Sequence, residues 1–262
     1  MPELPEVETV RLGLSEYLNG AKVTSVDIHD VRSLKRHVAG PHDFVQTLTG
    51  AKIAAVVRRG KFLWMPLTLA GEKSTHLALV GHLGMSGQML IRNRGDEPDK
   101  LTRITIHVKS AAGEALEFRF VDQRLFGSLQ LDQLVATPDA GHGGFAPELA
   151  GSTDSASWWN QIPASAAHIA RDPLDERFDL ESVLAQFKKK SSGIKRVLLD
   201  QGVLSGVGNI YADEALWRAR VHYDHPANRL RRDRALKLME AVRDILAAAV
   251  EAGGTSFDEQ YK

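Results

Sequence analysis

The chain has 262 residues, of which 43% are hydrophobic and 25% are charged, and its 33 basic side chains balance its 33 acidic ones. This composition is typical of a globular protein with a substantial core, and it excludes disordered and fibrous chains. Its apolar runs fall short of the ~18 residues that a membrane span needs, and its acidic start lacks the features of a secretory signal. We therefore expect a cytoplasmic protein with no membrane partner and, because no heptad pattern is present, a monomer.

Metal sites are restricted by the complete absence of cysteine. Without thiolates the chain has no disulfide, no thiol nucleophile and no cysteine-ligated zinc. The ten histidines include no HExxH motif and are scattered over separate segments, so they do not show the spacing of metal ligands. The sequence therefore predicts no metal and no cofactor.

The first predicted element is an amphipathic helix that follows an extended lead of five residues. Val7, Val10, Leu14 and Leu18 recur at steps of three and four, which places them on one helical face. From residue 22 to residue 131 the chain consists of short β-type runs separated by Gly, Pro and Asp turns. That spacing predicts a β-sandwich or a barrel.

The next segment, residues 136–173, is rich in Gly, Pro, Ser and Ala and is interpreted as a linker with at most short helices. Beyond it, capping and periodicity signals predict helices over 179–189, 194–201, 206–218 and 233–252. We therefore expect an α+β protein with flanking helices on its sandwich. Its predicted parts are an N-terminal domain over 1–135, the linker over 136–173 and a helical domain over 174–262.

Charge is distributed unevenly along the second half of the chain. Residues 132–187 carry nine acids and two bases, whereas residues 188–237 carry twelve bases and five acids. This contrast favours a local surface for an anion on an otherwise balanced protein. A solvated helical face explains the same charges equally well.

The strongest chemical signal is at the start of the chain, where removal of Met1 would leave Pro2 with a free secondary amine. An α-amino group has a pKa of about 8, so an unprotonated fraction exists near neutral pH. Attack of this amine on a sugar C1′ gives an iminium ion, which acts as an electron sink for elimination. Glu3 and Glu6 could protonate a departing or ring oxygen and position the amine, although acids at a helix start are also favoured by the helix dipole.

Two glycine-rich loops carry side chains suited to a gap in a DNA stack. Residues 81–87 surround Met85 with glycines, and an exposed apolar side chain of this kind can act as a wedge. Residues 121–127 place Arg124 and Phe126 before a glycine turn, where they could bond an orphaned base and stack in the space of an everted one. Taken singly, a buried Met in a tight turn and a core Phe are the commoner outcomes.

Phosphate contacts are predicted at two places. Lys61 opens a strand, where its ammonium could bind a phosphate or protect a sheet edge against aggregation. The glycine-rich turn over 202–211 leads into a helix whose exposed N-terminus, with Asn209 and with Lys195 nearby in sequence, suits a phosphate. Tight packing of two helices explains the same glycines.

Four motifs, taken together and in order, resemble the bacterial formamidopyrimidine-DNA glycosylase family. They are the opening MPELPEVETV, HLGMSGQ at residues 82–88, QRLFG at residues 123–127 and LLDQGVLSGVGNIYADEALW at residues 198–217. The likeness runs from residue 1 to about residue 260. The opening is closer to the formamidopyrimidine branch than to the related endonuclease VIII branch.

The resemblance implies a bifunctional repair enzyme that excises 8-oxoguanine and ring-opened purines from duplex DNA and cleaves the abasic strand by β- and δ-elimination. It implies an N-terminal β-sandwich and a helix-two-turn-helix domain, with damaged DNA between them in a bacterial cytoplasm. The implied catalytic residues are Pro2 as Schiff-base nucleophile, Glu3 as acid, Glu6 as supporting carboxylate and Lys61 as a phosphate contact. The implied DNA-binding residues are Met85, Arg124, Phe126, Lys195 and Asn209, with Arg124 reading the opposite cytosine.

One departure from the family concerns its zinc finger. The family usually continues past residues 253–255 through a lesion-capping loop into a finger with four cysteine ligands, whereas this sequence stops at Lys262 without a cysteine. The sequence is either cut short or belongs to a finger-less form. The second alternative predicts weak DNA binding and impaired excision, because a phosphate clamp at the reacting nucleotide is missing.

Two other classes of function compete with a glycosylase. A finger-less paralogue would bind damaged or abasic DNA through the same cleft without catalysis. A small-molecule enzyme of mixed fold would show no steep fall of DNA affinity with salt.

Overall fold

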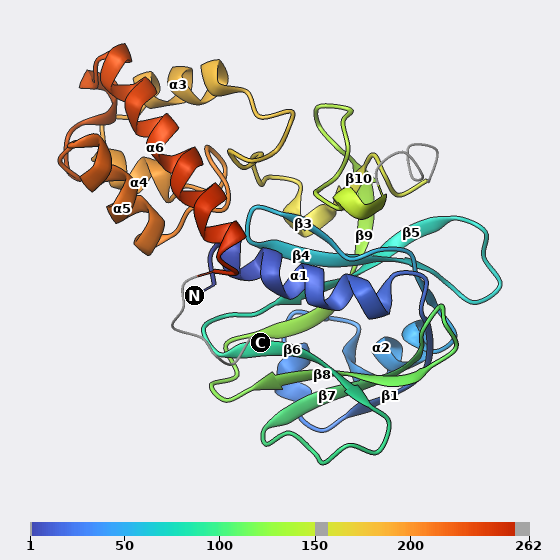
Figure 1. Cartoon of the computed structure of the whole chain (residues 1–262). Coiled ribbons are helices and arrows are strands. Elements are labelled where there is room, and N and C mark those ends of the chain that lie inside the picture. Colours follow the sequence, from blue (N-terminus) through green and yellow to red (C-terminus); the bar gives the residue numbers. More distant parts are fainter. Residues whose placement is uncertain (1, 150–156, 255–262) are drawn as a thin grey trace.

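Helix α1 (Leu4–Leu18) crosses the molecule at the junction of a β-rich lobe and a smaller helical lobe, as Figure 1 shows. The computed structural model describes residues 2–149 and 157–254. The strands are β1 (Lys22–Ile28), β2 (Lys52–Ile53), β3 (Val57–Arg59), β4 (Phe62–Thr68), β5 (Thr75–His82), β6 (Gly87–Asn93), β7 (Thr102–Lys109), β8 (Ala115–Asp122), β9 (Ser128–Ala136) and β10 (Gln161–Pro163). The helices after α1 are α2 (Gly40–Leu48), α3 (Leu180–Lys189), α4 (Ile194–Leu198), α5 (Asn209–Ala219) and α6 (Arg232–Glu251). Short 3-10 turns are η1 (Val31–Leu34), η2 (Pro147–Leu149), η3 (Ala164–Ala166) and η4 (Ala227–Arg229).

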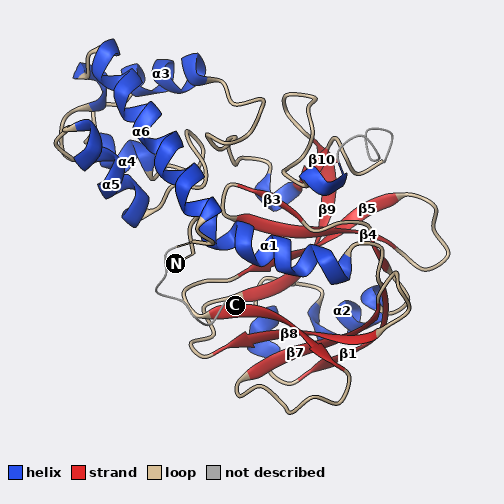
Figure 2. Cartoon of the chain, viewed as in Figure 1, coloured by secondary structure: helices blue, strands red, loops and turns tan. Residues whose placement is uncertain are grey.

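The strands follow one antiparallel path in the order β10-β9-β5-β4-β2-β1-β7-β8-β6, with β3 paired to β4. Only the two-residue strand β2 joins β4 to β1, and the path folds over there. Strands β4, β5 and β9 form one layer, and β1, β7, β8 and β6 form the other (Figure 2). The expected α+β fold with a β-sandwich and a helical C-terminal region is confirmed.

The core of the β-rich lobe lies between these layers. Leu63, Met65 and Leu79 come from one layer, Ile106 and Phe118 come from the other, and all five are buried in one cluster. The short β-type runs expected from the sequence therefore place apolar side chains inward, on the face that each strand turns to the other layer.

Helix α1 contributes to both lobes. Val7, Val10 and Leu14 pack in the core of the β-rich lobe, whereas Leu4 belongs to the core of the helical lobe. The helix begins at Leu4, so the expectation of a five-residue extended lead is wrong. Proline is tolerated in a first helical turn, where its missing N–H has no intrahelical partner, and Pro5 occupies that turn.

The segment interpreted as a linker with at most short helices contains a strand. Strand β10 pairs with β9 through Gln161↔Ala136, and its Ile162 is fully buried. Three residues in a Gly- and Ser-rich region show no periodicity, and the strand is stabilised by its partner rather than by its own sequence.

The four helices of the helical lobe occur in the predicted order, but some of them begin or end at other residues than predicted. Asp179 caps α3 by accepting a hydrogen bond from the Ser182 amide at 3.1 Å, as predicted. Helix α4 ends at Leu198, before the expected residue 201. Helix α5 begins at Asn209 rather than at residue 206, because Gly206 has a φ of 88°, outside the helical region. No helix within residues 2–149 and 157–254 is both long and apolar enough for a bilayer.

Candidate functional site

Pro2 lies in a small recess where the start of the chain meets strands β4 and β5. Lys61 and His82 line this recess, together with Gly84 of the following loop. Burial lowers the pKa of the Lys61 ammonium, an effect that the charge of Glu3 partly offsets. The recess therefore combines Pro2, the second residue of the chain, with a lysine that loses its proton more readily than an exposed one.

Glu3 is buried at 4% exposure, and its carboxylate caps the start of α5. It accepts hydrogen bonds from the amides of Gly208 at 2.7 Å, Ile210 at 2.9 Å and Tyr211 at 3.3 Å. Burial raises the pKa of Glu3, whereas these three backbone donors lower it and the nearby Glu6 raises it. The net effect is a raised pKa, so Glu3 keeps its proton to a higher pH than an exposed glutamate does.

Glu6 connects the backbone of Glu3 to the helical lobe. Its side chain accepts a hydrogen bond from the Glu3 amide at 3.0 Å and another from the Tyr211 hydroxyl at 2.8 Å. Tyr211 is itself buried in α5. Glu3 and Glu6 are therefore more than solvated acids at a helix start, because both bind the opposite lobe.

The predicted phosphate site at the start of α5 is occupied by a side chain of the protein. The sequence predicts that they bind a phosphate, but Glu3 occupies those of Gly208, Ile210 and Tyr211. An anion is bound there because a helix N-terminus favours one, and it comes from the chain itself. Asn209 is exposed at the first position of α5, beside this occupied nest.

Lys195 lies on α4 and pairs with Asp213 of α5 at 2.8 Å. Its side chain is 25% exposed. The structure therefore places Lys195 near α5, as the sequence predicted, but with an acidic partner that the sequence did not indicate.

Met85, Arg124 and Phe126 come together from the two glycine-rich loops. Met85 is 54% exposed and Phe126 is 48% exposed. The Arg124 guanidinium carbon lies 5.0 Å from the Phe126 ring centroid, and its Nη1 lies 4.0 Å from the Met85 sulfur. The alternatives of a buried Met and a core Phe are excluded, and the loops present an exposed apolar and cationic cluster.

Asp122 holds these two loops together, although nothing in the sequence singled it out. It is fully buried. One oxygen accepts hydrogen bonds from the Ser86 hydroxyl at 2.6 Å and the Arg124 amide at 3.1 Å. The other accepts from the Gly127 amide at 2.8 Å. Its only sequence signal is its position directly before the motif at residues 123–127.

The glycine at position 84 is required by the same contact between loops. Its φ is 62°, and a Cβ atom there would lie 2.7 Å from the Gly127 nitrogen. Only glycine accommodates both the left-handed backbone and this close approach.

A buried ion network behind the recess was also missed. Asp172 accepts hydrogen bonds from Arg58 Nη1 at 2.9 Å and from the Gly60 amide at 3.1 Å. Arg58 donates in turn to Glu8 of α1 at 2.5 Å. Because Gly60 directly precedes Lys61, the segment before the helical lobe fixes the turn that presents Lys61.

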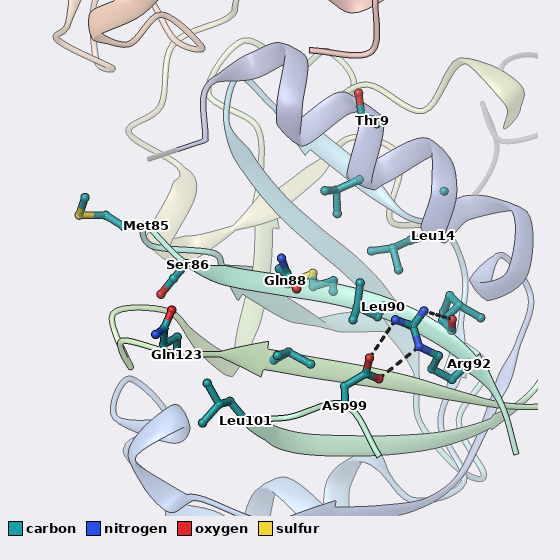
Figure 3. Close-up of a pocket in the computed structure, with 15 residues that line it drawn as sticks. Thr9, Leu14, Met85, Ser86, Gln88, Leu90, Arg92, Asp99, Leu101 and Gln123 are labelled. Atoms are coloured by element: carbon teal, nitrogen blue, oxygen red, sulfur yellow. Dashed lines mark hydrogen bonds and ion pairs between the residues drawn. The ribbon is translucent and has the colours of Figure 1, made fainter. Parts of the chain in front are cut away.

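A cavity of about 580 Å³ opens between α1 and β6. Met85 and Ser86 lie at one end of it, and the ion pair of Arg92 with Asp99 lies at the other (Figure 3). Gln88 of β6 also lines it. The cavity thus begins beside the exposed Met85 and offers amide and hydroxyl groups along its wall.

The residues present do not fit a four-cysteine zinc site. The sequence has no cysteine. Within the described ranges, 2–149 and 157–254, no group of three or more His, Cys, Asp or Glu side chains is arranged to hold a metal ion.

Comparison with known proteins agrees with this arrangement. Residues 1–129 match the model of the formamidopyrimidine-DNA glycosylase N-terminal domain, and residues 169–260 match that of the formamidopyrimidine-DNA glycosylase H2TH domain. The formamidopyrimidine-DNA glycosylase of Leifsonia xyli is 48% identical over 261 residues, which cover 100% of this chain and 83% of that protein.

Solved structures share the fold. A complex of Lactococcus lactis Fpg with DNA containing an abasic site matches with a TM-score of 0.74 and 26% identity, over 97% of this chain and 80% of that one. A complex of MutM with DNA containing carbocyclic 8-oxo-G matches with a TM-score of 0.74 and 27% identity, over 97% and 83%. With both family domains matched in order and nearly half of its residues shared with a relative, the chain belongs to the formamidopyrimidine-DNA glycosylase family.

Proposed function

We propose that the chain excises oxidised purines, 8-oxoguanine and formamidopyrimidines, from duplex DNA and then cleaves the abasic strand. The observation that carries this proposal is the recess in which Pro2 lies beside Lys61, with Glu3 held behind it by the start of α5. The DNA in the complexes of Lactococcus lactis Fpg and MutM, which contain an abasic site and 8-oxo-G, supports this substrate class.

The reaction begins when the Pro2 amine attacks C1′ and the base departs. Proton transfer from Glu3 to the ring oxygen opens the sugar and leaves an iminium ion between C1′ and the proline nitrogen. Loss of the C2′ proton to solvent then expels the 3′ phosphate, and loss of the C4′ proton expels the 5′ phosphate. Water finally hydrolyses the imine, which releases the sugar remnant and restores the Pro2 amine. The iminium supplies the electron sink, so the residues of this chain perform both steps and we propose no cofactor.

Supporting roles follow from the same geometry. Glu6, which binds the Glu3 amide and the Tyr211 hydroxyl, keeps Glu3 in place. Lys61 binds a phosphate next to the reacting sugar. Arg124, Met85 and Phe126 fill the space of the everted nucleotide, with Arg124 on the opposite cytosine.

Lys195 and Asn209 bind backbone phosphate on the helical lobe. Because three amides at the start of α5 bind Glu3, the Asn209 side chain, rather than the amide nest, makes this contact. We propose the same division of the chain as before, with an N-terminal domain over 1–135, a linker over 136–173 and a helical domain over 174–262. We further propose that the protein acts as a monomer in the bacterial cytoplasm, on nucleoid DNA.

The cavity between α1 and β6 is suited to receive the everted base, because it opens beside Met85. Replacing Gln88 with alanine should then slow excision of 8-oxoguanine, which needs the base in place. Cleavage of a preformed abasic site should be unchanged, because that substrate has no base. Equal effects on both substrates would contradict this assignment.

Borohydride reduction of the imine tests the central step. The chain with Met1 removed should form a covalent adduct with duplex DNA containing 8-oxoguanine or an abasic site. The adduct should disappear in Pro2→Gly and in protein that retains Met1, while intact mass reports the state of the N-terminus. DNA binding without any adduct would favour the non-catalytic paralogue, and the absence of salt-dependent DNA binding would favour a small-molecule enzyme.

A further inference from the structure

A second cationic site lies at the other end of α5, away from Glu3. A pocket of about 320 Å³ is formed there by the end of α5, the following loop and the start of α6. Its lining residues are Arg220, Val221, His222, His225, Leu230, Arg231 and Arg234. Among these residues there is no carboxylate, so the lining is suited to an anion.

The charges of this pocket are only partly neutralised by neighbouring acids. Arg231 pairs with Asp233 at 2.8 Å. In residues 2–149 and 157–254, however, no carboxylate pairs with Arg220 or Arg234. By contrast, Arg218 and Arg232, which do not line the pocket, pair with acids of α6 and α3. Two of the three arginines in the lining therefore keep a charge that no acid of the described chain neutralises.

The backbone fixes these two arginines relative to each other. Arg220 ends α5 in a left-handed conformation with a φ of 53°, and its carbonyl accepts a hydrogen bond from Arg234 at 2.6 Å. One donor of Arg234 is thereby used, while a guanidinium carries five. The remaining donors can bind an anion while this hydrogen bond stays in place.

The lining favours a bare phosphate over a nucleotide or another small molecule. Val221 and Leu230 are its only apolar side chains, and no Phe, Tyr or Trp is among the described residues that line it. The only rings that the described lining offers to a nucleobase are the imidazoles of His222 and His225, whereas its three arginines all suit phosphate. Arginines that bind only phosphate are typical of contacts to a nucleic-acid backbone.

The length of α5 gives the separation between the pocket and Glu3. Helix α5 has 11 residues, so about 16 Å separate its first turn, where Glu3 is bound, from Arg220. Base pairs are about 3.4 Å apart along the axis, so this span equals about five of them where α5 runs along the duplex. The start of α6 lies at the end of the helical lobe remote from α1 (Figure 1).

We propose that the pocket lined by Arg220 and Arg234 binds a backbone phosphate of the duplex flank, about five base pairs from the damaged nucleotide. This proposal rests on the proposed function, since it requires the chain to bind damaged duplex DNA. It adds a sequence-independent contact at a distance from the chemistry, and it assigns part of the basic segment 188–237 to DNA.

The test measures affinity for duplexes that contain a non-cleavable abasic-site analogue. One duplex has flanks of about 15 base pairs on both sides, and two others have one flank cut to about three base pairs, too short to reach the pocket. The variant Arg220→Gln/Arg234→Gln should bind the long duplex about tenfold more weakly than the unmodified protein. Its salt slope should be smaller by about 0.9 for each phosphate that it no longer neutralises. On one of the two duplexes with a short flank, the double variant and the unmodified protein should show the same affinity and the same salt slope.

A matched control removes two exposed charges elsewhere. Arg94 and Lys100 lie in the loop after β6 and are exposed, so Arg94→Gln/Lys100→Gln should bind all three duplexes like the unmodified protein. Arg220→Gln alone keeps the Arg234 side chain and should show a smaller loss of the same kind, with an unchanged melting temperature. That single variant separates lost binding from lost folding.

Other results would overturn the proposal. An equal loss on long and short flanks would show that these arginines act at the lesion or through general charge. No loss would show that the pocket does not touch DNA. Weak binding of inorganic phosphate that the double variant abolishes, with DNA affinity unchanged, would assign the pocket to free phosphate. If the unmodified protein bound no abasic duplex and formed no borohydride adduct, the proposed function itself would fail.

Discussion

The carboxylate of Glu3 lies 2.7 Å from the amide nitrogen of Gly208. A side chain at position 208 would overlap this carboxylate, because a Cβ atom there points directly at it. The proposed acid and the glycine-rich loop of the helical lobe are therefore in direct contact. The absence of a side chain at residue 208 is what admits Glu3 to the start of α5.

Gly208→Ala should displace Glu3 from its three backbone donors. We expect excision to fall by about 100-fold or more, which is the usual contribution of a positioned acid. Folding stability should fall by about 1–3 kcal/mol from overpacking. Single-turnover excision and urea unfolding measure the two effects. Gly202→Ala is the matched control, because only the Asp200 side chain and a more distant carbonyl lie near its added methyl. Full activity of Gly208→Ala would show that Glu3 is not held for catalysis.

Asp122→Asn should loosen both glycine-rich loops. The amide nitrogen of the new asparagine replaces one of the two oxygens that accept hydrogen bonds from Ser86, Arg124 and Gly127. At least one of these buried donors then has no acceptor, which costs about 1–3 kcal/mol. We expect the preference for cytosine opposite the lesion to fall about tenfold, since Arg124 loses its fixed position. Excision rates opposite cytosine and adenine give this ratio. Ser86→Ala, which removes only one of the bonds to Asp122, should have a smaller effect, and an unchanged ratio in Asp122→Asn would contradict the positioning role.

Asp172→Asn should destabilise the protein through its buried partner. Asp172 is 2% exposed, and without its charge Arg58 keeps Glu8 as its only acidic partner in the described part of the chain. Breaking such a buried pair costs about 3–5 kcal/mol, which urea unfolding would detect. The same change at the exposed helix cap, Asp179→Asn, should leave stability nearly unchanged, because Asn caps as well as Asp. Equal stability of the two variants would rule out the proposed importance of the network.

Phosphate binding by Lys61 should weaken as the pH rises, and it should do so at a lower pH than for an exposed lysine. Burial lowers its pKa below the ordinary value of 10.5, so the ammonium is lost earlier as protons are removed. The affinity advantage of the unmodified protein over Lys61→Met should therefore shrink between neutral pH and pH 10.5. A constant affinity ratio over this range would contradict the prediction.

The lowered pKa of Lys61 has the opposite consequence for the folding stability of the DNA-free protein, which should increase as the pH rises. Because folding favours the neutral amine, the unfolded chain binds more protons at this group than the folded one. The contribution of Lys61 to stability therefore rises with pH from its folded pKa up to the ordinary pKa of 10.5. Urea unfolding of the unmodified protein and of Lys61→Met over this range measures the difference.

Much of the site could be predicted because its side chains are carried by short, local motifs. Met85, Arg124 and Phe126 each belong to a glycine-rich loop, which is typical of a turn, although a buried Met and a core Phe are the commoner outcomes for these residues taken singly. Their meeting in space depends on β6 pairing with β8, which is a property of the sheet. The existence of α1 could be predicted for the same reason, since its buried face repeats at helical spacing, but its start at Leu4 could not.

Residues that act through distant partners could not be predicted. Arg58 and Asp172 are 114 residues apart, and charged side chains at such separation carry no periodic signal. The anion at the start of α5 could also be predicted only in part. The sequence correctly indicated an anion there, but only the fold shows that Glu3, more than 200 positions earlier, supplies it.

The sharing of α1 between two cores bears on how the protein can be divided. A gene fragment that encoded only the region after the linker would lack Leu4, which is fully buried in the core of the helical lobe. It would also leave the Gly206 carbonyl without the Leu4 amide that bonds to it at 2.9 Å. The isolated C-terminal part should therefore be poorly folded, and adding a synthetic peptide of the first eighteen residues in trans should restore its structure.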